Sequence, residues 1–363
     1  MDFSTLCALE YMAMADRENF HTALLAWMLG EKSPLPLARK VAVLNALLGA
    51  PLPMLASMTT DTEQADIDLV VTCLLRDGSS FAVVVENKLK SQESEGQLDK
   101  YDKELENRQV HTKVFLTLLG DQPIRGRNWR AAGYQQLLDV LDNTAPQNAS
   151  QEDRYILDLR SMMRRILDAV RLVLHEPRFA QYAFGKKPAQ TAPLDEESFA
   201  SYVERLRLGG LLQRAWYGNL RCQLSQSLDP NWSTKLAMGP RSGSLLDIFT
   251  IVGASGAQVR VGLQLQSLVL KAFCSPHPYF EKAAPESKVL VELSLERIRE
   301  SLSLDASKQA TRTRNRGFRS FTLLKAAEDS YATSTWVQPI LMHYRKLATE
   351  FASASEALGA KRP

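Results

Sequence analysis

The feature that most constrains this chain is a pair of apolar runs that carry charged residues at one end. Residues 66–71 begin as a strict alternation of acidic and apolar residues, and residues 81–85 form an apolar run rich in valine. The segment 77–80, Asp-Gly-Ser-Ser, lies between them and is typical of a turn. The sequence therefore predicts a β-hairpin.

Three charged residues lie at the open end of this hairpin, away from the turn. Glu86 and Lys88 share one face of their strand, because side chains alternate along a strand. Asp68 lies on the same face if the residue numbers of two paired residues add up to an even value. One such pairing has Val70 opposite Glu86 and Asp68 opposite Lys88. A two-residue loop gives an odd sum, so this arrangement requires a three-residue turn or a bulge.

Two carboxylates and an ammonium at the end of a buried strand suit phosphodiester hydrolysis. Buried charges need partners, and a hard divalent cation held by Asp68 and Glu86 provides one. Lys88 is then placed to orient the attacking water or to stabilise charge on the phosphate. The cysteines and histidines are scattered, with no CxxC or HExxH motif, so the donor set points to Mg²⁺ or Mn²⁺ rather than zinc. Asp68, Glu86 and Lys88 are therefore the candidate catalytic residues.

The surrounding sequence predicts helices before and after the hairpin. The order helix, hairpin, helix, strand, helix indicates an α/β or α+β module with a mixed sheet. The hydrophobic periodicity predicts helices at residues 15–29, 37–48, 133–141 and 152–174, a helical stretch after residue 90, and a strand at 110–119.

With this order, the Asp68…Glu86-x-Lys88 pattern resembles the PD-(D/E)XK nuclease superfamily, although Ile67 stands where proline is usual. Gln97 and Tyr101 resemble the Q-x-x-x-Y element of its RecB-like branch. The resemblance covers about residues 10–145. It implies a restriction-endonuclease-like core, a mixed sheet flanked by helices.

The resemblance also implies an activity, a metal and its ligands. It implies a Mg²⁺- or Mn²⁺-dependent deoxyribonuclease that acts in phage defence or DNA repair. Glu18 resembles the acidic residue of the first core helix, which makes it a metal ligand beside Asp68 and Glu86; Gln97 and Tyr101 help to hold nucleic acid. Two alternatives stay open: Asp66 competes with Asp68, and Glu10 competes with Glu18.

Basic clusters supply further candidates for nucleic-acid contact, although charge runs are often only solvated surface. One lies at residues 125–130, where arginines flank an aromatic residue, and one at residues 308–325, where arginines alternate as in a loop or edge strand. The candidates are Arg127, Arg130, Lys308, Arg312, Arg314, Arg316 and Arg319.

A glycine- and proline-containing segment at residues 184–193 predicts a domain boundary. We expect a nuclease-like domain at residues 1–185 and an α+β accessory domain at residues 194–363 that selects substrate, binds a protein partner or senses a ligand. Within the second domain the sequence predicts helices at residues 197–228, 295–301 and 337–351 and strands at 232–237, 245–252, 258–266 and 268–273.

The chain has no long uncharged apolar run, and its N-terminus lacks the basic region of a secretory signal. We therefore expect a cytoplasmic protein that does not contact the membrane. An alternative function keeps the same fold without turnover: a catalytically silent or partner-dependent nucleic-acid-binding module. The intact Asp68, Glu86 and Lys88 argue against it.

Overall fold

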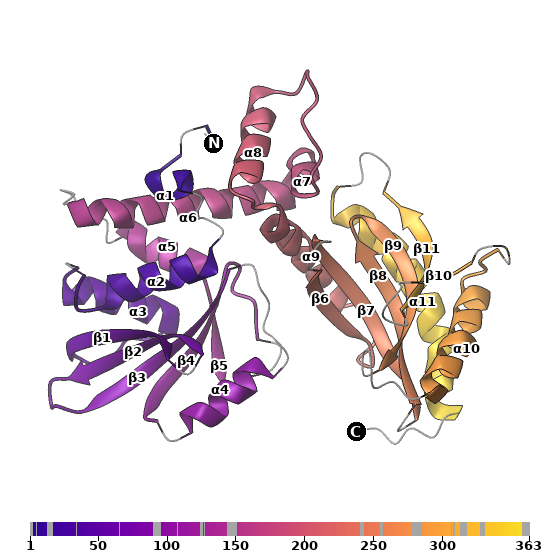
Figure 1. Ribbon diagram of the computed structural model, residues 1–363, viewed down its shortest axis with the longest axis horizontal. Helices are drawn as coiled ribbons and strands as arrows, with labels where there is room; N and C mark the ends of the chain where they lie inside the picture. Colours follow the sequence, from indigo (N-terminus) through magenta and orange to yellow (C-terminus); the bar gives the residue numbers. More distant parts are fainter. Residues whose placement is uncertain are drawn as a thin grey trace. The chain divides into compact units, whose positions relative to one another are not determined.

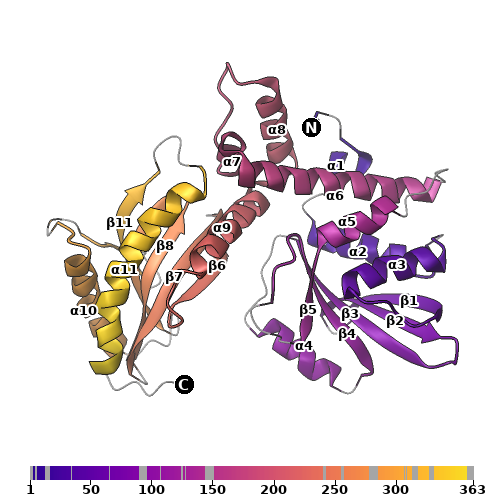
Figure 2. The same ribbon diagram turned by 180° about the vertical axis from the view of Figure 1, so that it is seen from behind.

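The computed structural model of the chain is shown in Figure 1 and, from behind, in Figure 2. The structure describes residues 3–4, 6–12, 17–33, 35–64, 66–89, 96–106, 108–123, 126, 128–143, 151–239, 243–254, 257–277, 285–305, 307, 309–312, 318–326 and 331–357. The chain divides into two compact units: an N-terminal unit of residues 1–171 with 187–211, and a C-terminal unit of residues 172–186 with 212–363. The predicted domains at residues 1–185 and 194–363 stay a prediction.

The N-terminal unit is built on a mixed sheet that has five strands in the described part of the chain, in the order β1-β2-β3-β4-β5. The first three strands are antiparallel, whereas β4 runs parallel to β3 and β5 parallel to β4. The strands are β1 (Leu55–Gln64), β2 (Ile67–Leu75), β3 (Ser80–Lys88), β4 (Val110–Thr117) and β5 (Trp129–Gly133). The predicted α/β core with a mixed sheet is confirmed.

Helices cover both faces of this sheet. The helices α2, α3 and α5 lie on one face and α4 lies on the other (Figures 1 and 2). The helix α4 packs Leu98, Tyr101 and Leu105, which share one side of the helix, against Val70 and Val84 of the sheet. The helices of this unit are α1 (Ala8–Tyr11), α2 (Glu18–Leu29), α3 (Leu37–Leu48), α4 (Gln97–Leu105), α5 (Tyr134–Asn143), α8 (Leu194–Arg205) and the greater part of α6 (Gln151–His175).

The C-terminal unit contains a second, antiparallel sheet, which has six strands among the described residues in the order β10-β11-β9-β8-β7-β6. The helices α10 and α11 pack on one face of it (Figure 2). Its elements are α7 (Pro177–Ala183), most of α9 (Gly209–Ser225), β6 (Ser233–Gly239), β7 (Gly243–Ala254), β8 (Ala257–Gln266), β9 (Val269–His277), α10 (Pro285–Ser301), β10 (Thr311–Arg312), β11 (Arg319–Lys325) and α11 (Ser334–Ala357). No helix in the described ranges is both long and apolar enough to cross a membrane.

The single helix predicted at residues 197–228 is wrong, because the structure has two helices there, α8 and α9. Arg207, just after α8, has a left-handed backbone with φ of 54°. The Leu208 N–H donates to the Val203 carbonyl at 3.0 Å, a bond typical of a helix that ends in a left-handed turn. Apolar periodicity continues across this break, which is why the pattern suggested one helix.

The strands β1 and β5 were not predicted from the sequence. The signal for β1 was present, since Thr59, Thr60 and Thr62 are β-branched residues that favour strands. In contrast, β5 spans only Trp129–Gly133 and pairs in parallel with β4, so nothing local marks it.

Candidate active site

The structure brings Asp68, Glu86 and Lys88 together where β2 begins and β3 ends. The Lys88 Nζ atom lies 2.7 Å from Glu86 Oε1 and 3.9 Å from Asp68 Oδ2. Glu86 is fully buried, and the side chain of Lys88 is 11% exposed. All three side chains lie on the sheet face that α4 covers, as the alternation of β3 requires.

In the hairpin, the residue numbers of paired residues add up to an even value, as the grouping of the three charged residues requires. Leu69 pairs with Val85 and Val70 with Val84, so Asp68 falls opposite Glu86. The pairing that the sequence analysis gave as its example, with Asp68 opposite Lys88, is therefore wrong by two residues. A shift of two leaves every side chain on the same face, so the group still forms.

The hairpin loop explains this parity. The Leu75 N–H donates to the Ser79 carbonyl at 2.8 Å, and the Gly78 N–H donates to the Leu75 carbonyl at 3.1 Å, which encloses a three-residue loop. Gly78 has φ of 87°, a left-handed conformation that glycine adopts without strain. A β-turn followed by a left-handed residue is the usual three-residue hairpin loop, the kind that the grouping of charges required.

Glu18 reaches the same group from the N-terminal end of α2. Its Oε2 atom accepts a hydrogen bond from the Leu89 N–H at 2.8 Å, and its Oε1 atom lies 3.5 Å from Lys88 Nζ. In contrast, Glu10 is bound to Arg165 and Tyr202 in a separate cluster. Of the two glutamates weighed for this position, the structure places Glu18 at the candidate site.

Asp66, the alternative to Asp68, points elsewhere. Its exposed carboxylate is paired with the Lys100 ammonium at 2.6 Å. Asp68 is instead held in the group, since its Oδ2 atom accepts a hydrogen bond from the Asn87 N–H at 2.8 Å. The geometry thus favours Asp68.

The predicted Gln97 and Tyr101 lie on the side of α4 that faces this group. Gln97 Nε2 donates to Glu86 Oε1 at 2.7 Å and lies 2.8 Å from the Tyr101 hydroxyl oxygen. The Tyr101 hydroxyl donates to the Asp66 carbonyl at 2.7 Å. The pair therefore connects a central carboxylate to the turn between β1 and β2, and its predicted contact with nucleic acid stays a prediction.

Burial and charge shift the protonation equilibria of the group. Burial, followed by repulsion from Asp68, raises the pKa of Glu86 to about 7 against the attraction of Lys88. Burial also raises the pKa of Asp68. For Lys88 burial alone would lower the pKa, but the charges of Glu86, Asp68 and Glu18 outweigh it and raise the pKa. Lys88 therefore keeps its proton at neutral pH.

The donor set fits a hard divalent cation. Glu86 Oε2 is a buried oxygen with no hydrogen-bond partner in the described part of the chain, beside the carboxylate of Asp68. A buried acceptor of this kind is rare and calls for a ligand. No three His, Cys, Asp or Glu side chains among the described residues form a complete cation site as they stand. Mg²⁺ is usually held by one or two carboxylates together with water and substrate, so Asp68 and Glu86 suffice.

One residue that the sequence analysis passed over is central to this geometry. Asn87, between Glu86 and Lys88, is 1% exposed and projects to the opposite face of the sheet. Its side chain bonds to Thr22 of α2 and to Tyr134 of α5. A polar residue that ends a run of buried valines was the available signal.

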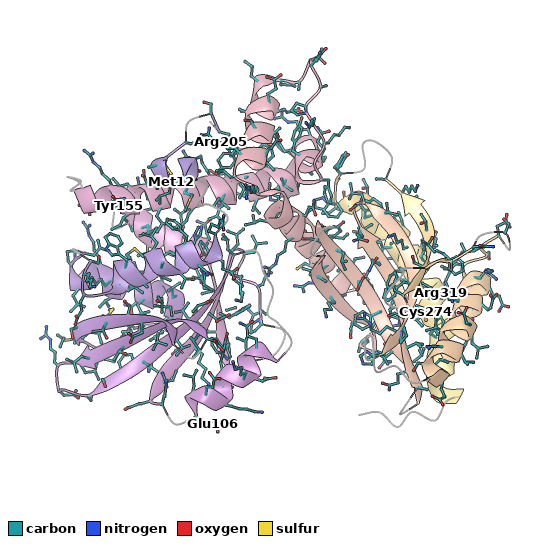
Figure 3. The ribbon with its side chains drawn as sticks, in the orientation of Figure 1. Met12, Glu106, Tyr155, Arg205, Cys274 and Arg319 are labelled. Atoms are coloured by element: carbon teal, nitrogen blue, oxygen red, sulfur yellow. The ribbon has the colours of Figure 1, made fainter. Side chains whose placement is uncertain are left out.

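Few of the predicted phosphate contacts fall on described side chains. Arg130, in β5, donates to the Leu47 carbonyl at 3.3 Å and so caps the end of α3. Arg319 begins β11, pairs with Cys274 in the sheet (Figure 3) and forms an ion pair with Glu292 at 2.7 Å. Arg127, Lys308, Arg314, Arg316 and the side chain of Arg312 lie outside the described residues.

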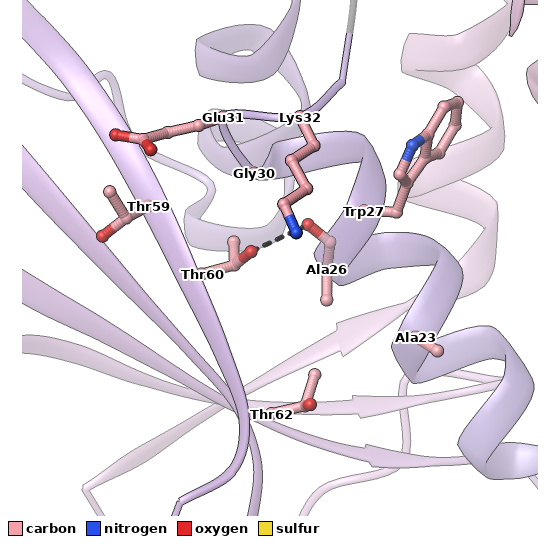
Figure 4. A pocket seen from close by; sticks show the side chains of 9 residues that line it. All are labelled: Ala23, Ala26, Trp27, Gly30, Glu31, Lys32, Thr59, Thr60 and Thr62. Atoms are coloured by element: carbon pink, nitrogen blue, oxygen red, sulfur yellow. Dashed lines mark hydrogen bonds between the residues drawn. The ribbon is translucent and has the colours of Figure 1, made fainter.

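A cavity of about 390 Å³ lies between α2 and the edge strand β1 (Figure 4). The Thr60 hydroxyl donates to the Ala26 carbonyl at 3.0 Å beside it. The cavity shares no lining residue with the charged group, so it is not the candidate active site. It is lined by Ala23, Ala26, Trp27, Gly30, Glu31, Lys32, Thr59, Thr60 and Thr62.

Comparison with known proteins gives a match over the segment that contains this site. Residues 56–161 match the family model of the PD-(D/E)XK nuclease superfamily, a range that includes Asp68, Glu86 and Lys88. Neither the curated proteins nor the solved structures contain a match to the chain. The predicted resemblance to this superfamily is confirmed over the matched residues, and it implies a nuclease-type function with a nucleic-acid substrate and a divalent metal. The RecB-like branch and the Q-x-x-x-Y element stay predictions.

Proposed function

We propose that this protein is a Mg²⁺- or Mn²⁺-dependent deoxyribonuclease whose active site is formed by Asp68, Glu86 and Lys88. One observation carries the proposal. Glu86 is a fully buried carboxylate with an oxygen that has no hydrogen-bond partner among the residues that the structure describes, and a second carboxylate and an ammonium lie beside it. Such an arrangement is costly for an apolar core and useful for binding a cation and a phosphate.

The carboxylates have the role of holding the cation. Asp68 and Glu86 would each donate one oxygen, and Glu18 would be the third ligand, from α2. When bound, the cation neutralises charge at the scissile phosphate and makes water more acidic. Gln97 orients Glu86 through its 2.7 Å hydrogen bond, which leaves Glu86 Oε2 for the cation.

Lys88 supplies a fixed positive charge. Its raised pKa keeps the proton on Nζ, so the ammonium can donate to a phosphoryl oxygen while negative charge develops there. Asp68 and Glu86 would hold the cation, and Lys88, 2.7 Å from Glu86 and 3.9 Å from Asp68, would supply its positive charge beside them.

DNA is the proposed substrate, and phage defence or DNA repair the proposed role, by analogy with the restriction and repair nucleases of the superfamily. Arg127, Arg130, Lys308, Arg312, Arg314, Arg316 and Arg319 are the proposed phosphate contacts, with Gln97 and Tyr101 beside the scissile strand. The four cysteines are unpaired, which agrees with a place in the cytoplasm. The C-terminal unit would select substrate or bind a protein partner.

The test is incubation of the purified protein with linear DNA, circular DNA and single-stranded RNA, each with Mg²⁺, with Mn²⁺ and with EDTA. The variants are Glu86→Ala and Lys88→Ala. Asp77→Ala is the matched control, because Asp77 lies at the far, exposed end of the same hairpin, where its carboxylate accepts hydrogen bonds from the N–H and the hydroxyl of Ser79.

We expect cleavage of DNA that requires metal, disappears in both active-site variants and survives in the control. Loss of circular DNA would establish internal cutting. Cleavage of RNA alone would overturn the proposed substrate. The absence of cleavage under every condition, with nucleic-acid binding retained, would instead favour the silent or partner-dependent module.

A further inference from the structure

Asn87 is the polar residue at the end of an apolar strand face. Val83 and Val85 precede it on the same face and are fully buried, as is Asn87 itself at 1% exposure. An apolar side chain of similar size would be buried here at less cost, because an amide needs partners for every donor and acceptor. The structure supplies these partners.

The partners come from both helices that cover this face. Asn87 Nδ2 donates to Thr22 Oγ1 at 3.0 Å, and the Tyr134 hydroxyl donates to Asn87 Oδ1 at 3.0 Å. Burial raises the pKa of Tyr134, so its hydroxyl stays a donor. The amide group of Asn87 is thereby fixed between α2 and α5, in a network without solvent access.

The same residue also contacts the acidic residues of the candidate centre, through its backbone N–H and its side-chain amide nitrogen. Its backbone N–H donates to Asp68 Oδ2 at 2.8 Å, and its Nδ2 atom lies 3.5 Å from the Glu18 carbonyl oxygen. Glu86 is its neighbour in the chain. Asn87 thus bonds directly to the Asp68 carboxylate, follows Glu86 in the chain and lies beside the main chain of Glu18.

We propose that Asn87, locked by Thr22 and Tyr134, is a positioning residue that sets the spacing of Asp68, Glu86 and Glu18 for a divalent cation. The inference rests on the proposed function, because it concerns the same metal site. Partners behind metal ligands of this kind typically change metal affinity or activity by about 10- to 100-fold when they are removed.

The test must separate positioning from folding. A single Asn87→Leu change would leave the Thr22 and Tyr134 hydroxyls buried without a partner, which is destabilising by itself. The triple variant Thr22→Val/Asn87→Leu/Tyr134→Phe removes the whole network with side chains of similar shape. Replacing all partners together is nearly neutral for stability, so we expect a change in unfolding midpoint of no more than about 4 °C.

The matched control is Tyr344→Phe in the C-terminal unit. The Tyr344 hydroxyl accepts a hydrogen bond from the Asp229 N–H at 2.6 Å, so this change also removes one tyrosine hydroxyl from a contact with another element. It leaves Asn87 and the three carboxylates unchanged.

The readout is Mn²⁺ binding, followed by electron paramagnetic resonance, with cleavage kinetics as a second measurement. We expect the dissociation constant for Mn²⁺ to rise at least about tenfold in the triple variant and to stay unchanged in Tyr344→Phe. We also expect saturating Mn²⁺ to restore part of the cleavage rate, which a generally damaged fold would not allow.

An unchanged Mn²⁺ affinity in the triple variant would overturn the inference, as would a wild-type protein that binds no Mn²⁺. A wild-type protein that binds Mn²⁺ with the expected dependence on Asn87 but cleaves no nucleic acid would overturn the proposed function alone. The two failures are therefore distinguishable.

Discussion

Glu10 and Glu86 are both fully buried glutamates of the N-terminal unit, but their surroundings differ. Glu10 Oε1 accepts hydrogen bonds from Arg165 Nε at 2.9 Å and from the Tyr202 hydroxyl at 2.8 Å. Its Oε2 atom accepts from the Cys7 N–H at 3.0 Å and from the Arg165 guanidinium. Glu86 Oε2, in contrast, has no hydrogen-bond partner in the described structure.

The two pKa values move in opposite directions for this reason. Burial alone would raise the pKa of Glu10, but the hydrogen bonds from Arg165, Cys7 and Tyr202 outweigh it and lower the pKa. Burial raises the pKa of Glu86, and Lys88 does not fully compensate. A buried acid whose oxygens are all bonded holds the fold together, whereas one with a free oxygen is prepared for a ligand.

The sharpest test of this difference is Glu86→Gln. We expect the cleavage rate to fall on the order of 1000-fold, because an amide cannot replace the carboxylate toward a cation. At pH 5, where folded Glu86 is largely protonated, the free energy of unfolding should change by less than about 1 kcal/mol, because glutamine resembles the protonated acid. Cleavage of linear DNA in Mg²⁺ and urea unfolding in EDTA measure the two effects. Activity within tenfold of wild type would break the comparison.

The reverse result is expected for Glu10→Gln. Removing this charge leaves the buried part of the Arg165 guanidinium without its counter-ion and should cost about 3 kcal/mol of unfolding free energy. The cleavage rate of the folded protein, measured well below its unfolding midpoint, should stay within about twofold of wild type. A selective loss of cleavage with unchanged stability would mean that Glu10 serves the active site.

The dependence of stability on pH provides a third test. A raised pKa means that folded Glu86 binds a proton more tightly than the unfolded chain does, so the metal-free protein should lose stability as the pH rises from about 4.5 to about 7. The raised pKa of Asp68 acts in the same direction. The lowered pKa of Glu10 acts oppositely: its contribution is present above the unfolded value and is lost as the pH falls through the folded value.

Urea unfolding in EDTA at pH 5, 6, 7 and 8 checks these signs. The free energy of unfolding of Glu86→Gln minus that of wild type should be greater at pH 8 than at pH 5. The reason is that the variant lacks the carboxyl group whose deprotonation destabilises the wild-type fold. In the metal-binding assay the same deprotonation is required, so Mn²⁺ affinity should rise with pH up to about 7. A stability difference that does not vary with pH would contradict the assigned environment of Glu86.

The smallest expected effects come from one neighbour of each glutamate. Tyr202→Phe removes a hydrogen bond to Glu10 and should cost about 1.5 kcal/mol of unfolding free energy without changing cleavage. Gln97→Met removes the donor to Glu86 and should lower cleavage about tenfold with little loss of stability. Equal effects of the two changes on stability and on cleavage would remove the distinction between the two environments.

Much of the candidate site followed from local pattern. The alternation in β2 and β3 placed Glu86 and Lys88 on one face, and the requirement for a three-residue loop was met by residues 76–78. These inferences succeeded because strand alternation and turn geometry depend on neighbouring residues only. A local pattern also explains the wrong prediction around Arg207. The apolar periodicity continues through this residue, but its left-handed backbone ends one helix before the next begins.

The sequence by itself determined the hairpin, the mixed α/β core and the identity of the three charged residues at its end. Only the tertiary structure decided that Glu18 rather than Glu10 meets them, and that Asn87 is fixed by Thr22 and Tyr134. The physical reason is the range of the interactions. Glu10 binds a tyrosine 192 residues away, and Asn87 bonds across 65 and 47 residues. Whether a buried polar group finds its partners depends on such distant residues, which no local pattern reports.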